Sequence, residues 1–255
     1  MRILLFLFTV FCILLTCSRD WDNPVDRKSE QENKMPTEGL VAYYPFNGNA
    51  NDESGNRHNG LIYGPTLTLD RFGNSQGAYL FDGIDDYIVV PHSSKFNFGK
   101  QFSIAAWIKP IEWGENSYGR IIDKSDARDI VGYRLLLSNS GFSTDDFETF
   151  GLSLNDGNIG VRVISPKKTL SLNSFNFVAA TYDGEYVTLY FNTKLVKKEG
   201  IAILSSLNNS GNLILGNRTN QDRTFDGVLD EIWIYNRALS DEEVQALYHE
   251  GGWGE

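Results

Sequence analysis

From Gly39 onward the chain repeats one pattern, in which short apolar alternations are separated by clusters of Asn, Gly, Asp and Ser. Alternation over a few residues indicates strands, and such clusters are typical of the turns between them. The pattern contains no βαβ alternation and no repeat of about 30 residues, so it favours two packed antiparallel sheets. We predict strands near residues 39–46, 60–63, 78–82, 86–91, 102–109, 119–123, 133–138, 150–154, 159–164, 175–182, 185–191, 194–198, 212–216 and 225–235.

The last of these strands carries an acidic residue among apolar ones. Its parity places Asp230, Ile232 and Ile234 on one face, and Glu231, Trp233 and Tyr235 on the other. Because both faces become apolar after the first residues, the strand is expected to be covered on both sides. A buried carboxylate needs a partner or a metal ion. We therefore expect Asp230 to point toward the core, and its burial is a first indication of calcium.

One helix is predicted after this strand. Ser240 is its N-cap and Glu243 completes a capping box, while the glycines at 251 and 252 supply the end. Val244, Leu247 and Tyr248 share one face of this helix. The helix is expected to close the domain and not to carry chemistry.

The first residues are typical of an export signal. Arg2 precedes an apolar run, 3–15, that is too short to span a bilayer, and Cys17 follows at the expected cut. The segment 14–17 resembles a relaxed bacterial lipobox, although Thr16 stands where the stricter pattern has Gly, Ala or Ser. Lipid chains on Cys17 would anchor the protein to the bacterial outer membrane or cell surface. The alternative is ordinary signal cleavage beside an incidental cysteine.

Three regions follow from this start: a signal peptide at 1–16, a flexible tether at 17–38 and a single domain at 39–255. The only other cysteine, Cys12, lies in the segment to be removed, so the mature chain forms no disulfide of its own. Without Arg2 the chain has 22 basic and 33 acidic residues, a net charge of −11. This balance argues against nucleic acid as a partner, and it suits calcium and neutral ligands.

Five segments together resemble a known family: 39–46, 51–60, 79–88, 102–110 and 225–240. They are similar, in order, to the laminin G-like jelly-roll domains of the concanavalin A-like lectin/glucanase superfamily. The resemblance implies an all-β, two-sheet antiparallel jelly-roll sandwich with one short C-terminal helix. It says little about function, because the same sandwich serves lectins, enzymes and adhesive modules.

The resemblance also implies a structural calcium ion. Carried over to this chain, its ligands would be Asp52, Asn56, Asn59 and Asp230. Calcium prefers six to eight oxygen ligands, which such a loop supplies at short spacing. The alternative is a turn whose Asn and Asp side chains bond their own backbone. A second acidic cluster, 82–86, is interpreted as a hairpin turn, with a second ion as the less favoured alternative.

Catalytic patterns are missing from the sequence. The glucanases that share this fold need paired carboxylates, and their Glu-x-Asp-x-x-Glu motif does not occur here. Glu112 and Glu115 flank Trp113 and Gly114 in a predicted loop, as a solvated rim would. We therefore expect a binding module and not an enzyme.

Sugar binding needs exposed aromatic rings and a few polar groups. The predicted loops carry four such aromatics, which would alternatively pack onto the sheet: Trp113, Tyr118, Phe142 and Phe147. Trp107 and Trp233 lie in apolar strands and are predicted to be core. The resulting expectation is a lipid-anchored module that binds an extracellular glycan. The alternatives are a glycoside hydrolase or polysaccharide lyase with unrecognised acids, and an adhesive or scaffold module that binds a protein.

Overall fold

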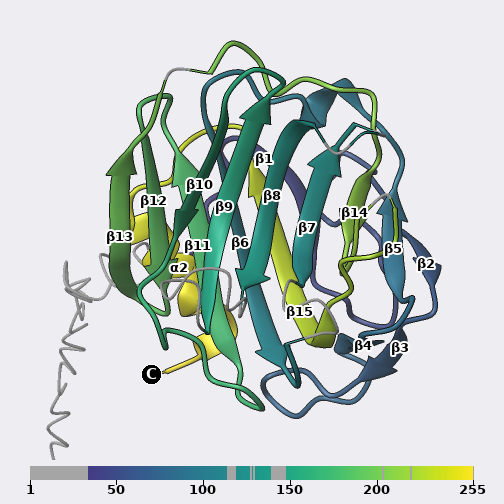
Figure 1. Ribbon diagram of the computed structural model, residues 1–255. Helices are drawn as coiled ribbons and strands as arrows, with labels where there is room; N and C mark the ends of the chain where they lie inside the picture. Colours follow the sequence, from purple (N-terminus) through teal and green to yellow (C-terminus); the bar gives the residue numbers. More distant parts are fainter. Residues whose placement is uncertain are drawn as a thin grey trace, which may run out of the picture.

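Two antiparallel sheets face each other in the computed structural model, which describes residues 34–113, 119–126, 128, 130–138, 148–202, 204–218 and 220–254 (Figure 1). Sheet A has the order β13 (Lys194–Gly200), β12 (Tyr186–Phe191), β11 (Asn176–Tyr182), β6 (Phe102–Pro110), β15 (Asp226–Tyr235), β4 (Ala78–Asp82) and β3 (Thr66–Thr68). An eighth strand, β1 (Leu40–Tyr44), pairs with the second half of β15.

Sheet B has the order β10 (Gly160–Ile164), β9 (Thr149–Asp156), β8 (Val131–Ser138), β7 (Arg120–Ser125), β14 (Leu213–Leu215), β5 (Tyr87–Val90) and β2 (Leu61–Tyr63). The helical elements are η1 (Ser94–Phe96), α2 (Asp241–Tyr248) and η2 (Glu250–Gly252). The predicted all-β jelly-roll sandwich with one short C-terminal helix is confirmed.

Every predicted strand is present, and one strand was missed. That strand, β3, follows Pro65 and has Leu67 as its one strongly apolar residue, whereas the equally short β2 and β14 are apolar throughout. It pairs with β4 at the edge of sheet A.

The main core lies between the sheets, and a second apolar layer covers the outer face of sheet A. Strand β6 shows how one strand serves both: Ile104, Ala106 and Ile108 belong to the inter-sheet core, whereas Ala105 and Trp107 belong to the outer layer. This double burial explains why the strand reads as an almost continuous apolar run.

Helix α2 covers this outer layer. The Ser240 hydroxyl accepts from the Glu243 N–H at 3.3 Å, and the Glu243 carboxylate accepts from the Ser240 N–H at 2.9 Å, so the predicted capping box is confirmed. Val244 and Leu247 pack in the same layer as Trp107 and Trp233. Within the described ranges, no helix is both long enough and apolar enough to cross a bilayer.

The end of the predicted tether is attached to the domain. The Trp233 indole N–H donates to Met35 Sδ at 3.2 Å, and the Tyr235 hydroxyl donates to the Pro36 carbonyl at 2.8 Å. Arg237 reaches the Glu38 carbonyl at 2.9 Å. Residues 35–38 therefore contact the folded unit, and the predicted division of the chain into signal peptide, tether and domain stays a prediction. The chain enters the fold on the outer side of sheet A, beside α2.

Candidate ligand-binding groove and buried charge cluster

The Asp52 loop, predicted to bind calcium, covers the free edge of β1. The Asp52 carboxylate accepts three backbone N–H groups, those of Tyr43 at 3.0 Å and of Ser54 and His58 at 2.9 Å each. The Asn59 side chain accepts from the Asp52 N–H at 3.0 Å. The Asn56 amide donates to the Leu40 and Val41 carbonyls at 3.1 and 3.0 Å. The loop thus satisfies backbone groups that an edge strand would leave open.

Asp230 lies elsewhere, and it points to the opposite face from the one that its parity predicts. Asp230 pairs with Trp107 of β6, whereas Ile232 pairs with the next residue, Ala106, so Glu231 is an extra residue in a β-bulge. The backbone of Glu231 has a φ of 42°, in the left-handed region. One inserted residue moves the preceding side chains to the other face of the sheet. The expectation that Asp230 points into the inter-sheet core is therefore wrong.

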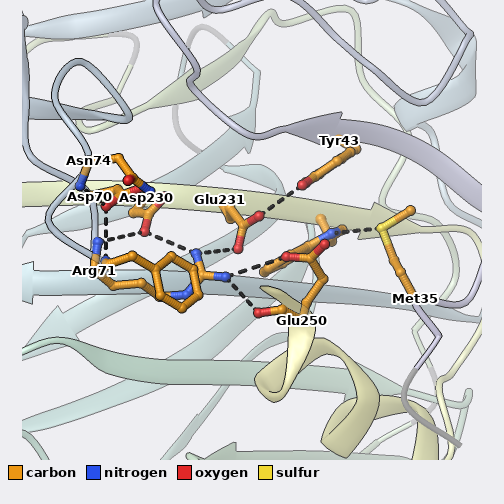
Figure 2. A network of polar contacts seen from close by, with 10 residues as sticks. Met35, Tyr43, Asp70, Arg71, Asn74, Asp230, Glu231 and Glu250 are labelled. Atoms are coloured by element: carbon orange, nitrogen blue, oxygen red, sulfur yellow. Dashed lines mark hydrogen bonds and ion pairs between the residues drawn. The ribbon is translucent and has the colours of Figure 1, made fainter. Parts of the chain in front are cut away.

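The cation beside Asp230 is Arg71, from the loop between β3 and β4 (Figure 2). Its guanidinium lies 3.0 Å from the Asp230 carboxylate and also forms an ion pair with Glu231. Arg71 further donates to the Glu250 carbonyl at 2.9 Å, and the guanidinium carbon lies 5.2 Å from the Trp107 ring centre. One arginine therefore joins the loop, the bulge of β15 and the C-terminal segment.

These contacts give each predicted calcium ligand a protein partner. Asp52, Asn56 and Asn59 bond to backbone groups in one loop, and Asp230 bonds to Arg71. The four do not fit a single shared ion, because Asp230 is engaged by a guanidinium on the outer face of sheet A. Calcium binding by these residues stays a prediction.

The charge cluster holds more carboxylates than cations. Burial raises the pKa of Glu231 to about 9, an effect that Arg71 opposes and that Glu250 and Asp230 reinforce. Burial likewise raises the pKa of Asp230 to about 6, with Arg71 opposing. The Tyr43 hydroxyl donates to a Glu231 carboxyl oxygen at 2.8 Å. Both acids are almost fully buried, at 1% and 6% exposure, so a substrate cannot reach them.

The predicted sugar-binding aromatics are largely beyond the described residues. Tyr118, Phe142 and Phe147 lie outside them, as does the predicted lipidation site Cys17. Trp113 is half-buried and packs against the inter-sheet core, which is the alternative foreseen for it. Trp107 and Trp233 are core residues, as predicted.

The acidic segment 82–86 is a turn, but it is not a hairpin. It connects β4 of sheet A with β5 of sheet B, so the two flanking strands do not pair. The Asp82 carboxylate accepts from the Ile84 N–H at 2.8 Å, and Asp86 accepts from the Asp82 N–H at 2.9 Å. Carboxylate oxygens of Asp82, Asp85 and Asp86 all lie within 4.8 Å of one another.

Beside this turn, two adjoining hollows form a groove on the outer face of sheet B. Their volumes are about 210 and 310 Å³, and they share Tyr87 and Gln221. We call this surface the tyrosine groove; its lining residues are Tyr63, Gly64, Asp85, Tyr87, Val89, Asn212, Ile214, Arg218 and Gln221. The register explains the position: β2, β5 and β14 are neighbours, and Ile88 and Leu213 turn inward, so Tyr87 and Asn212 face out.

Two stacked rings form one wall of the groove. Tyr63 and Tyr87 pair across β2 and β5, with ring centres 4.9 Å apart and planes inclined by 12°. Tyr63 is 48% exposed. Gly64 is needed here, because its φ is +95° and a Cβ would lie 1.8 Å from an Asp86 carboxylate oxygen. At the other wall, Arg218 donates to Asp222 at 2.6 Å, which lowers the pKa of that carboxyl.

This groove was not predicted from the sequence. The predicted aromatics lie in long loops, whereas Tyr63 and Tyr87 are at the ends of short strands. No alternation marked Tyr63 as an outward-facing residue, because Leu61, Ile62 and Tyr63 are all apolar and all exposed. The polar groups come from residues 212–221, more than a hundred positions later, and only the sheet order brings them near.

The fold is shared with sugar-binding proteins of known structure. Residues 82–245 match the family model described as the concanavalin A-like lectin/glucanases superfamily, of laminin G type. No curated protein matches the sequence.

Three solved structures illustrate the fold similarity. The binding domain of Paraclostridial Mosquitocidal Protein 1 has a TM-score of 0.68 at 20% identity, over 84% of this chain and 53% of that one. The botulinum neurotoxin serotype D ligand-binding domain, in complex with N-acetylneuraminic acid, has a TM-score of 0.64 at 21% identity, over 84% and 51%. This protein thus spans about half of each toxin domain.

Domain 4 of AbnA, a GH43 extracellular arabinanase from Geobacillus stearothermophilus, in complex with arabinotriose, has a TM-score of 0.63 at 20% identity. The match covers 82% of this chain and 98% of that one. The family match extends over more than half of the sequence. The chain therefore belongs to the concanavalin A-like lectin/glucanases superfamily.

Proposed function

We propose that this protein is an exported, lipid-anchored module that binds an extracellular glycan in the tyrosine groove. The observation that carries the proposal is the combination, along the tyrosine groove, of the stacked Tyr63 and Tyr87 with polar side chains, among them Asn212, Arg218 and Gln221.

The groove has the chemistry that a neutral sugar requires. Aromatic rings supply apolar faces for the C–H side of a pyranose, and amides and a guanidinium bond its hydroxyls. Stacking on Tyr87 holds the Tyr63 ring in place before a ligand arrives, which lowers the entropy lost on binding. Val89 and Ile214 supply an apolar floor.

Two of the structural neighbours support a sugar as the ligand class. The arabinanase domain was determined with arabinotriose and the serotype D toxin domain with N-acetylneuraminic acid. Their sequences are about 20% identical to this chain, so they support the proposal through the shared fold alone. The choice of the binding site depends on the groove residues.

The position of the N-terminal segment agrees with display on a membrane. Met35 and Pro36 are bonded to the outer side of sheet A, whereas the tyrosine groove opens on the outer side of sheet B. An anchor at Cys17 would thus be joined to the side of the sandwich opposite the ligand.

The enzyme alternative receives less support. The adjacent acids Asp230 and Glu231 are buried and paired with Arg71, so they are not presented to a substrate as a catalytic pair must be. We propose binding without cleavage.

A glycan array followed by affinity electrophoresis tests the proposal. Replacing Tyr63 or Tyr87 by Ala should weaken glycan binding about tenfold, because a lost ring contact is worth about 1.4 kcal/mol. Tyr186→Ala is the matched control, since this tyrosine is 42% exposed on β12, at the other edge of the sandwich. A wild-type protein that retains no glycan, or a Tyr186 variant that loses as much affinity as the groove variants, would contradict the proposal.

Calcium binding is tested separately by thermal melts with and without a chelator. If the Asp52 loop binds calcium, the chelator should lower Tm and Asp52→Ala should abolish that effect. Asp230→Ala decides whether Asp230 takes part, since its ion pair with Arg71 exists without a metal. Identical Tm values with and without chelator would contradict calcium binding.

A further inference from the structure

The tyrosine groove extends across three strands of sheet B. β2, β5 and β14 lie side by side (Figure 1), and each of them contributes lining residues. Tyr63 of β2 pairs with Tyr87 of β5 at one end, and Val89 of β5 pairs with Ile214 of β14 at the other. Neighbouring strands are about 4.8 Å apart and residues two positions apart on one strand about 7 Å, so the groove runs diagonally over about 12 Å.

Each hollow of the groove is small for a ligand pocket by itself. The hollow that contains Asn212 has a volume of about 210 Å³, and the hollow that contains Tyr63 has a volume of about 310 Å³. Pockets for small molecules typically have about 300–1,000 Å³. The two hollows meet at Tyr87 and Gln221, which line both. A ligand that fills the groove therefore has at least two linked units, with the link beside these two side chains.

A polar side chain is available at each end of the groove. The Asn212 carbonyl oxygen accepts from the His92 N–H at 3.0 Å, and its NH₂ group has no bond to the described part of the chain. At the other end, the exposed Asp85 carboxylate has neither a hydrogen bond nor an ion pair with any described residue. Arg218, by contrast, is already paired with Asp222 at 2.6 Å. The uncompensated charge in the groove is therefore negative.

The turn that carries Asp85 adds to this negative charge. Carboxylate oxygens of Asp82 and Asp86 lie within 4.8 Å of an oxygen of Asp85. These two acids accept backbone N–H groups of the same turn and do not line the groove. An acidic sugar beside Tyr63 would thus meet several like charges, whereas the hydroxyls of a neutral sugar can donate to Asp85.

We propose that the tyrosine groove binds an uncharged oligosaccharide of at least two sugar units, and that Asp85 excludes uronic acids from the end beside Tyr63. This inference rests on the proposed function and names its ligand class. Asp85 discriminates by repulsion, because an ionised carboxylate accepts hydrogen bonds from hydroxyls and cannot donate one to a second carboxylate.

The length of the ligand is tested by calorimetry with oligosaccharides of one to four units of galactose, glucose, mannose or arabinose. For each sugar that binds, the disaccharide should bind at least about tenfold more tightly than the monosaccharide, because only the disaccharide reaches both hollows. Equal affinity of the two would overturn the ligand of two or more units. Binding of array glycans without binding of any of these neutral probes would overturn the uncharged ligand.

The role of Asp85 is tested by comparing disaccharides of galactose, glucose and mannose with those of galacturonate, glucuronate and mannuronate at low salt. The wild type should bind a recognised neutral disaccharide about tenfold more tightly than its uronate counterpart, and added salt should reduce this ratio. Asp85→Asn should bring the ratio close to one. Asp183→Asn is the matched control, since it removes the same charge from an exposed turn between β11 and β12 and should keep the wild-type ratio.

Three results would overturn the role of Asp85 while leaving glycan binding in place. They are a wild type that binds uronates as tightly as neutral disaccharides, an unchanged ratio in the Asp85 variant, and an equal loss of discrimination in the Asp183 variant. Failure of the wild type to bind any probe or any array glycan would instead overturn the proposed function.

Discussion

The outer faces of the two sheets carry similar side chains, but those on sheet A are buried, whereas those in the tyrosine groove of sheet B are exposed. On sheet A, tyrosines, tryptophans and acids are covered by α2, by residues 35–38 and by the C-terminal segment, and the acids Asp230 and Glu231 are buried in contact with Arg71 and Tyr43. On sheet B, the stacked Tyr63 and Tyr87 remain at the surface beside Asn212 and Gln221. Aromatic and polar composition alone therefore does not distinguish a structural layer from a binding surface. The difference is made by the segments that cover a face. Buried polar groups must pair within the protein, whereas exposed ones are accessible to a ligand.

The largest effect that this comparison predicts is on the covered face. Arg71→Met should lower the free energy of unfolding by about 3–5 kcal/mol, because it leaves buried carboxylates without their cation. Urea unfolding monitored by tryptophan fluorescence measures it. The matched control is Arg128→Met, whose ion pair with Asp126 has a 77% exposed arginine and should cost at most about 1 kcal/mol. Equal losses in both variants would mean that the buried cluster is no more important than a surface pair.

The next effect is a dependence of stability on pH. Folding raises the pKa of Asp230 to about 6 and that of Glu231 to about 9, so the folded state binds more protons than the unfolded one between about pH 4 and pH 9. Stability should therefore fall as the pH rises through this window, by up to about 1.4 kcal/mol per unit for each titrating group.

Glu231→Gln isolates the contribution of one of these acids. The variant keeps a neutral side chain beside Tyr43 and should lose the decline above about pH 6, while the part due to Asp230 remains at lower pH. Unfolding free energies at a series of pH values provide the measurement. A variant that retains the full decline up to about pH 9 would show that another group is responsible.

A smaller effect on stability is expected at the N-terminus of α2, the helix that covers the outer face of sheet A. Ser240→Ala removes the capping box of α2 and should cost about 1 kcal/mol, since the freed N–H of Glu243 loses its acceptor. Ser94→Ala, at the exposed start of η1, is the control and should change Tm little. A Ser240 variant as stable as its control would imply that tertiary packing alone holds the helix on sheet A.

The smallest effect on stability is expected in the tyrosine groove. Tyr63→Ala should change the free energy of unfolding by no more than about 0.5 kcal/mol, because the ring is half exposed, even as glycan affinity falls about tenfold. Measuring both quantities on one preparation sharpens the contrast between the faces. If stability fell as far as in the Arg71 variant, the two tyrosines would be structural and the comparison would fail.

The fold was predictable because its signals are local. Alternation over a few residues marked all the strands except β3, and the Ser240 to Glu243 spacing marked the start of α2. The site was less predictable. The four predicted aromatics were chosen for their loops, and Trp113, the one within the described residues, packs on the core.

The requirement that Asp230 have a partner followed from its burial, but the identity of the partner did not. Arg71 is 159 positions away in the chain, and no local pattern links the two. The residues of the tyrosine groove are likewise brought together by the order β14, β5, β2.

The sequence by itself determined which segments are strands, where the last helix begins, and that an acid in the final strand had to be paired. Only the tertiary structure decided which way that acid points, which cation meets it, and which aromatic rings stay exposed. The physical reason is that the backbone conformation of a segment depends on residues that are neighbours in sequence. The direction of a side chain and its burial by other segments depend instead on the register between strands. A single extra residue at Glu231 turns Asp230 from one face of sheet A to the other.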